Sequence, residues 1–319
     1  MEFPDLIGHV REKKMLEEYM RSGRLPNVLL FTGTPGVGKR TLALYLSEYF
    51  LCHNRKGRDE CPSCKRVEKG THPDLISLGG KDEILGIDAI RWVSSEVYKR
   101  PYLSDTRFVI IDEAHLLTIE AANALLKTLE DSENFNFFIL ITSKEEELPL
   151  TVRSRCARIA FSPLKEESIK QYLVEKRGVE EKRAEIVSNL SFGSLSTAFF
   201  WMDEKNFSLR RRIAECVLGH KKNPVEITFL SEVISRKETD LYLTFLITLF
   251  RDFFVYGVTD NANRVYNKDL LDLLRGKNLE AKKIKEKMEM VMNALPLLKY
   301  NIGRWSFVEN LIISLREES

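Results

Sequence analysis

The segment Val28-Leu-Leu-Phe-Thr-Gly-Thr-Pro-Gly-Val-Gly-Lys-Arg-Thr41 decides the fold of this 319-residue chain. It begins with a short apolar run, Val28 to Thr32, and continues through a glycine loop, Gly33 to Gly38. Apolar residues at helical spacing follow between Thr41 and Leu46. A short apolar run of this kind indicates a buried strand, and the later spacing indicates a helix. The segment therefore predicts a strand, a phosphate-type loop and a helix in succession.

The loop matches the glycine and lysine part of the P-loop pattern, in which backbone N–H groups and a lysine hold phosphates at the start of a helix. The pattern next requires Ser or Thr, whose hydroxyl binds Mg²⁺, and this chain has Arg40 instead. Thr41 lies about 100° further round the helix and does not simply replace that hydroxyl. We expect weak binding of ATP or ADP with little contribution from Mg²⁺. The alternative is a glycine-rich turn without a ligand.

A second apolar run, Phe108 to Ile111, ends in Asp112 and Glu113. A nucleotide hydrolase needs an aspartate at such a strand end to hold Mg²⁺, and a glutamate to activate the attacking water. Acidic residues are also favoured at the start of a helix, so simple capping is the alternative. Because a phosphate-type loop lies upstream, the sequence favours the first interpretation, with Glu113 as the vestige of a catalytic base.

The rest of the first half continues the alternation of strands and helices. Phe137 to Thr142 is a third apolar run, and Thr118 to Glu130 has the apolar spacing of an amphipathic helix. Repeated strand and helix units predict an α/β domain with a parallel sheet. After Phe161 only helical patterns follow, in a short block from Pro163 and a longer one from about Phe207. The residues expected from these patterns to contact a nucleotide are Gly33, Pro35, Gly36, Val37, Gly38, Lys39, Arg40, Thr41 and Asp112.

The charged residues nearly cancel, with 49 Lys and Arg against 47 Asp and Glu. This balance excludes the global positive field of a dedicated nucleic-acid-binding protein, so any DNA contact is local or shared with partners. The first residues, Met1-Glu-Phe-Pro4, lack the pattern of a secretory signal. The most apolar stretch, Leu241 to Phe250, is ten residues long and too short to span a bilayer. We therefore expect a cytoplasmic protein with no membrane contact.

These segments together resemble the AAA+ clamp-loader subunits of bacterial DNA polymerase III. Within that family, residues 70–74, which follow a cysteine-rich segment, and the short C-terminal region resemble the delta-prime branch more than the ATP-hydrolysing gamma and tau branches. The matching segments are Leu6-Ile7-Gly8, Gly33 to Lys39, Asp112 to His115, Ala121 to Glu130, and Ser154-Arg155-Cys156.

The resemblance implies a domain organisation and a set of partners. A P-loop AAA+ domain is expected over residues 1–162, with a cysteine-containing insertion at about 52–67. A small α-helical lid over 163–204 and an α-helical collar over 205–319, which oligomerises, are expected to follow. The implied partners are the clamp-loader ATPase subunits and the delta subunit. Through the complex they also include the sliding clamp and primed DNA.

The chain also departs from the family pattern. Arg40 replaces the P-loop hydroxyl, and Ser196 stands where active relatives carry a lid arginine that reaches the nucleotide, so both point to lost hydrolysis. Arg155 matches the family's arginine finger, which acts in trans on a neighbouring subunit's ATP; the alternative is an ordinary exposed loop arginine. Thr142 matches the family's γ-phosphate sensor only loosely. Two whole-chain alternatives stay open: an ATP-hydrolysing gamma- or tau-type motor, and another AAA+ ATPase of DNA metabolism.

Five cysteines are an odd number, which argues against a disulfide framework and favours a metal or plain thiols. Cys61-Pro-Ser-Cys64 has the spacing of a metal-binding knuckle, and Cys52 precedes it as in the zinc module of clamp-loader relatives. Val67 stands where those relatives carry a fourth cysteine. A structural zinc site closes with four ligands. We therefore expect either zinc with a further ligand, for which His53 and His72 are candidates, or three thiols left from a lost site.

Overall fold

The computed structural model describes residues 6–80, 83–219, 224–275, 280–300 and 303–316. The chain divides into two compact units, each described by itself below. The first comprises Met1–Ser168 with Gly193–Leu195, and the second comprises Ile169–Phe192 with Ser196–Ser319. The residues expected to form the lid and the collar thus fall almost entirely in one unit. Their division at residue 204 stays a prediction.

The first unit is built on a five-stranded parallel sheet with the strand order β2-β3-β4-β1-β5. The prediction of an α/β domain with a parallel sheet is confirmed. The three inner strands are the apolar runs, and their side chains are almost all buried. The strands are β1 (Val28–Gly33), β2 (Leu75–Leu78), β3 (Arg107–Ile111), β4 (Asn136–Thr142) and β5 (Ala157–Phe161).

The edge strands β2 and β5 were not predicted from the sequence. Both are short, and both carry exposed polar side chains, such as Ser77 in β2 and Arg158 in β5. An edge strand is covered on fewer sides, so its sequence need not contain a continuous apolar run. Continuous apolar runs therefore predict the three inner strands but not the two edge strands.

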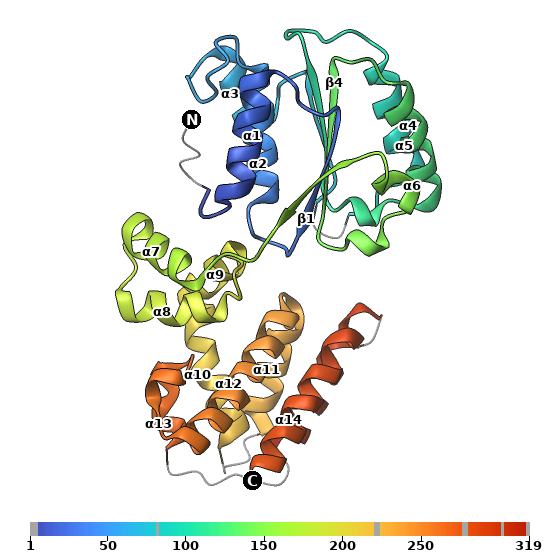
Figure 1. The fold of residues 1–319 in the computed structure, drawn as a ribbon. Helices are drawn as coiled ribbons and strands as arrows, with labels where there is room; N and C mark the ends of the chain where they lie inside the picture. Colours follow the sequence, from blue (N-terminus) through green and yellow to red (C-terminus); the bar gives the residue numbers. More distant parts are fainter. Residues whose placement is uncertain (1–5, 81–82, 220–223, 276–279, 301–302, 317–319) are drawn as a thin grey trace. The chain divides into compact units, whose positions relative to one another are not determined.

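Helices cover both faces of this sheet (Figure 1). Successive side chains of a strand point to opposite faces, so Leu29 and Phe31 of β1 pack with α1 and α2, while Leu30 packs with α4 and α5. The predicted amphipathic helix is confirmed as α5. The helical segments of this unit are α1 (Val10–Ser22), α2 (Lys39–Leu51), α3 (Pro62–Glu68), α4 (Ile87–Val97), η1 (Ala114–Leu116), α5 (Ile119–Asp131), η2 (Glu145–Glu147) and α6 (Leu150–Arg153).

The described part of the chain beyond β5 contains helices and no strand, as the sequence predicted. The division between the two units falls within α7, after Ser168, and within α9, after Leu195. The helices are α7 (Glu166–Arg177), α8 (Glu181–Leu190), α9 (Leu195–Met202), α10 (Glu204–Leu218), α11 (Pro224–Arg236), α12 (Thr239–Thr259), η3 (Ala262–Arg264), η4 (Lys268–Leu270), α13 (Leu271–Leu274), α14 (Ala281–Ala294), η5 (Leu295–Lys299) and α15 (Arg304–Arg316).

Helix α12 is longer than the ten-residue apolar run predicted from the sequence. The helix has 21 residues, and an 18-residue window of it has a mean hydropathy of 1.5, so by length and composition alone it could cross a membrane. Half of that window is buried inside the protein, where α12 packs against α10, α11 and α14. Its Asp252 is fully buried and accepts hydrogen bonds from the backbone N–H groups of Tyr266 and Asn267, at 2.9 and 2.8 Å. These contacts are those of a core helix, and they agree with the interpretation of the apolar run as a segment that does not span a membrane.

Candidate nucleotide site and cysteine cluster

The predicted nucleotide-binding residues meet at the carboxyl edge of the sheet. β1 leads into the glycine loop, Asp112 follows β3 directly, and Thr142 ends β4, which pairs with β1 through Thr32. Ligands of open parallel sheets bind outside this edge. The strand order, with β4 between β1 and β3, brings the three segments together although they are far apart in the sequence.

The glycine loop has the backbone shape of a phosphate cradle. Gly33, Gly36 and Gly38 have φ values of 137°, 75° and 104°, which side chains with a Cβ rarely adopt. A Cβ at Gly33 would lie 2.2 Å from the Phe161 carbonyl oxygen, so only glycine fits there. Successive backbone N–H groups of a turn form an anion-binding concavity when the backbone has a suitable conformation. The loop keeps glycine at the three positions where its backbone has positive φ values.

Lys39 is folded back onto the loop. It is 5% exposed, and its Nζ donates hydrogen bonds to the carbonyl oxygens of Gly33 and Thr34, at 2.5 and 2.8 Å. Burial lowers the pKa of Lys39, while Glu113 and Asp112 oppose that shift. An anion at the loop would compensate the buried ammonium group more fully than the two carbonyl groups do. Lys39 is thus available for the role that the sequence predicted.

Arg40 occupies the position at which the P-loop pattern places the hydroxyl that binds Mg²⁺. Its guanidinium donates a hydrogen bond to Asp112 Oδ2 at 2.9 Å and another to Ser77 Oγ at 3.3 Å. The residue that replaces the metal-binding hydroxyl therefore also takes the carboxylate that would be the other protein anchor of Mg²⁺. The guanidinium repels Mg²⁺ and competes with it for this oxygen, and position 40 offers no hydroxyl to hold the ion. The residues present do not fit Mg²⁺.

The carboxylate expected to be a vestigial base is held by its neighbours. Glu113 has a left-handed backbone, with φ of 48°, and its Oε2 accepts a hydrogen bond from Ser143 Oγ at 3.3 Å. The same oxygen lies 3.3 Å from Nδ1 of His115. That nitrogen is also 3.1 Å from Thr142 Oγ1, which accepts from the N–H of Lys144. The loosely matched sensor position and the vestigial base are thus joined through His115, a role that the sequence did not suggest.

The outer side of the loop is closed by residues distant in sequence. The Gly36 carbonyl accepts a hydrogen bond from the N–H of Leu195 at 2.9 Å, and the Val37 carbonyl lies 2.8 Å from Nε2 of His9. Leu6 packs so closely that a Cβ on Gly38 would come within 2.6 Å of its Cδ1. These contacts place Leu6 and His9 against the loop.

Arg155 lies between α6 and β5, and its side chain is 40% exposed. Its Nε donates to Glu130 Oε1 at 2.5 Å, and another guanidinium nitrogen donates to the Thr151 carbonyl at 2.9 Å. Within the described residues these are its hydrogen bonds, and none goes to the glycine loop of its own chain. The sequence identified the arginine but not its partner Glu130.

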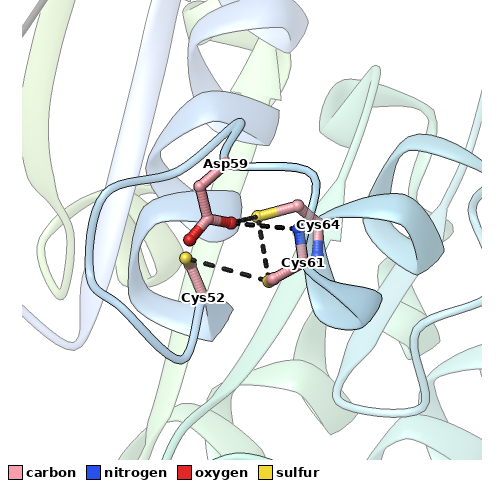
Figure 2. A group of neighbouring side chains, drawn as sticks. All are labelled: Cys52, Asp59, Cys61 and Cys64. Carbon is pink, nitrogen blue, oxygen red and sulfur yellow. Dashed lines mark hydrogen bonds between the residues drawn. The ribbon is translucent and has the colours of Figure 1, made fainter.

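Three cysteines gather where the cysteine-containing insertion was predicted. Cys61 Sγ lies 4.0 Å from Cys52 Sγ and 3.5 Å from Cys64 Sγ, and none of the three forms a disulfide. Figure 2 shows the carboxylate of Asp59 facing them, with Oδ1 at 3.2 Å from Cys64 Sγ. Among the described residues, the fourth potential ligand in this group is therefore the carboxylate of Asp59.

Neither histidine considered as the fourth ligand belongs to this group. His72 is buried and engaged elsewhere: Nε2 lies 2.8 Å from Ser63 Oγ, and Nδ1 accepts from the N–H of Asp74 at 3.1 Å. Burial lowers the pKa of His72. His53 is exposed. The two histidine candidates thus lie outside the group, because spacing along the chain does not report the direction of a side chain.

Comparison with known proteins gives consistent similarities. The family model described as "DNA polymerase III, delta subunit" matches residues 8–165. The chain is 30% identical over 246 residues to the DNA polymerase III subunit delta' of Escherichia coli K12, covering 75% of this chain and 73% of that one. It is 25% identical over 317 residues to subunit delta' of Bacillus subtilis 168, covering 96% of each.

Longer relatives match as well. The chain is 28% identical to the DNA polymerase III subunit tau of Bacillus subtilis 168, of which it spans 53%, about half the length. Among solved structures, a DNA polymerase III gamma subunit-related protein of Thermotoga maritima aligns over 95% of this chain and 98% of its own, with a TM-score of 0.55. At 20% identity that likeness supports the fold alone.

Proposed function

The chain belongs to the family of DNA polymerase III clamp-loader subunits, and from this premise we propose that it is a delta-prime-type subunit that does not hydrolyse ATP itself. It would assemble with the ATPase subunits and the delta subunit in the cytoplasm. Through that complex it would contribute to loading the sliding clamp onto primed DNA.

The single observation that carries the proposal is the ion pair between Arg40 and Asp112, at 2.9 Å. Hydrolysis at a P-loop needs Mg²⁺ to bridge the phosphates and to neutralise the developing charge. Here a guanidinium stands where the metal's hydroxyl ligand is expected and also neutralises the metal-binding carboxylate. A loop that keeps its phosphate cradle but has lost its metal anchor suits a subunit that binds nucleotide weakly or not at all.

Both branches appear among the relatives, since the Bacillus subtilis delta' subunit aligns over 96% of this chain and the tau subunit of the same organism aligns over 85%. The choice of the delta-prime branch therefore rests on the pair of Arg40 with Asp112 and not on the similarities. The ATP-hydrolysing gamma- or tau-type motor remains the rival. It is distinguished by magnesium-dependent turnover of the isolated chain.

In this proposal Arg155 acts on the ATP of a neighbouring subunit. A guanidinium presents a planar fork to two phosphate oxygens and stabilises the charge that spreads over the transferring phosphoryl group. Its pair with Glu130 is half exposed on both sides, and such pairs contribute only about 0.2–1 kcal/mol. Arg155 can therefore leave Glu130 for a neighbour's phosphate at a small cost in free energy. The finger can be held in place by Glu130 until the subunits assemble.

The test measures ATP hydrolysis by the isolated chain and by a loader reconstituted with its ATPase and delta subunits. The isolated chain should give no turnover. Arg155→Ala should assemble normally, and turnover should fall at the one site that faces it. Loss of such a finger costs about 10³–10⁵ in rate at the affected site. Other ATP sites in the loader would make the overall decrease smaller.

Arg158→Ala is the matched control, because Arg158 is similarly exposed and forms a comparable ion pair with Glu145 at 2.7 Å. Arg155→Lys should lower ATP turnover as the alanine variant does, since an ammonium group keeps the charge but lacks the planar fork of donors. Equal losses in Arg155→Ala and Arg158→Ala would mean general electrostatics and would refute the finger assignment. Magnesium-dependent turnover by the isolated native chain would identify a motor subunit instead.

A further inference from the structure

We infer that Asp59 completes a zinc site with Cys52, Cys61 and Cys64, in place of the fourth thiolate that position 67 does not provide. The site would be structural, because all four ligands come from the protein and leave no open position for a reacting group. The inference does not depend on the proposed function. It concerns the stability of the insertion between α2 and α3.

The local sequence directs the side chains of Cys61 and Cys64 towards each other. Cys61 is the N-cap of α3, and its Sγ accepts a hydrogen bond from the N–H of Cys64, one turn into the helix. Pro62, at the first position of the helix, has no N–H to satisfy and fixes the turn. Cys52 lies just past the end of α2, where its N–H bonds to the Glu48 carbonyl. The three thiols therefore converge from two helix ends.

The loop between these helices turns Asp59 towards the thiols (Figure 2). Asp59 Oδ1 accepts a hydrogen bond from the N–H of Cys61 at 3.2 Å, and its other oxygen accepts from Asn54 Nδ2 at 2.6 Å. N–H groups directed at sulfur and carboxylate stabilise the deprotonated forms that bind metal.

The separations between ligand atoms agree with tetrahedral zinc. Two sulfur atoms each bound at about 2.3 Å lie about 3.8 Å apart, and a sulfur and a carboxylate oxygen lie about 3.6 Å apart. The observed sulfur separations are 4.0 and 3.5 Å, and the observed distance from Cys64 Sγ to Asp59 Oδ1 is 3.2 Å. All four ligand atoms lie within 4.8 Å of one another. One ion fits between them without a rearrangement of the backbone.

The donor set selects the metal. Three thiolates and one carboxylate suit zinc, whereas Mg²⁺ and Ca²⁺ require oxygen ligands. Bound zinc would join the end of α2, the helix that carries Lys39 at its start, to α3. The helices already pack against each other, so the ion would fix an existing contact.

The experiment uses the full-length chain purified under reducing conditions. Zinc content after dialysis should be one ion per chain. Replacement by Co²⁺ should give a thiolate-to-cobalt charge-transfer band together with the visible bands of a tetrahedral ion. Asp59→Ala should weaken zinc binding by at least about tenfold, since even loss of an outer hydrogen-bond partner of a zinc ligand costs about 10–100-fold. Its cobalt spectrum should also change.

Two further variants keep the result interpretable. Glu60→Ala is the control, because Glu60 is the adjacent exposed carboxylate and does not belong to the cluster. It should bind zinc like the native chain. Asp59→Cys should restore tight binding and strengthen the charge-transfer band by about one third, as a fourth thiolate joins three. A native chain without zinc affinity would overturn the inference, as would an Asp59→Ala chain with native affinity and an unchanged cobalt spectrum.

Discussion

Replacing Arg40 by serine tests the nucleotide site most directly. The change restores a hydroxyl at the position after Lys39 and at the same time releases Asp112 from its guanidinium partner. In the native chain, we expect nucleotide affinity to differ by less than about twofold between Mg²⁺ and EDTA, because the metal gains no protein ligand there. In Arg40→Ser, Mg²⁺ should tighten nucleotide binding by at least about tenfold. A hydrogen bond to a charged group contributes about 1.5–3 kcal/mol, and tenfold in affinity is about 1.4 kcal/mol.

The same change should leave the fold nearly as stable as before. Arg40 is 46% exposed, so its ion pair contributes only about 0.2–1 kcal/mol after solvent screening. Arg40 also places a positive charge in the first turn of α2, where the helix dipole disfavours it by about 0.3–1 kcal/mol. The two effects oppose each other. The melting temperature should therefore move by no more than about 4 °C.

The assay is titration calorimetry with ATP or ADP, with Mg²⁺ or EDTA, on three variants beside the native chain. Arg40→Lys keeps a positive charge without a hydroxyl and should stay independent of Mg²⁺. Arg158→Ser removes an exposed arginine elsewhere and should behave like the native chain. The reasoning fails if native binding is tight and dependent on Mg²⁺, or if Arg40→Ser gains no dependence while its melting temperature is unchanged.

Three further outcomes are expected. Glu130→Gln should alter ATP hydrolysis by the reconstituted loader by no more than about fivefold, because its pair with Arg155 is exposed; a change as large as that in Arg155→Ala would mean that Glu130 itself is essential. Burial lowers the pKa of His9 below its ordinary 6.5, so the unfolded chain takes up the proton first as pH falls, and stability should decline below pH 6.5. Urea denaturation from pH 7 to pH 5 should show a smaller decline for His9→Asn, with the remainder from His72, whose pKa is lowered in the same direction. The isolated chain should be monomeric or weakly associating in sedimentation velocity; a stable homo-oligomer at micromolar concentration would contradict assembly through other subunits.

Local sequence determined the centre of the fold and the shape of the loop. The runs that became β1, β3 and β4 are buried on both faces, so burial alone made them continuous and apolar. The loop glycines hold positive φ values that the backbone requires whatever surrounds them. Patterns of this kind act over a few residues and can be read without a tertiary structure. Edge strands β2 and β5 lacked the pattern because water covers part of them.

The partners of the functional side chains were decided only by tertiary structure. The residue in the magnesium position, Arg40, finds Asp112 and Ser77, which lie 72 and 37 positions further along the chain. Asp59 was not distinguished in the sequence from other surface acids until the loop turned it towards the cysteines. A charged side chain carries no local signal of which opposite charge it will meet. That choice follows from the strand order and the chain's path between helices, which only packing of the whole unit fixes.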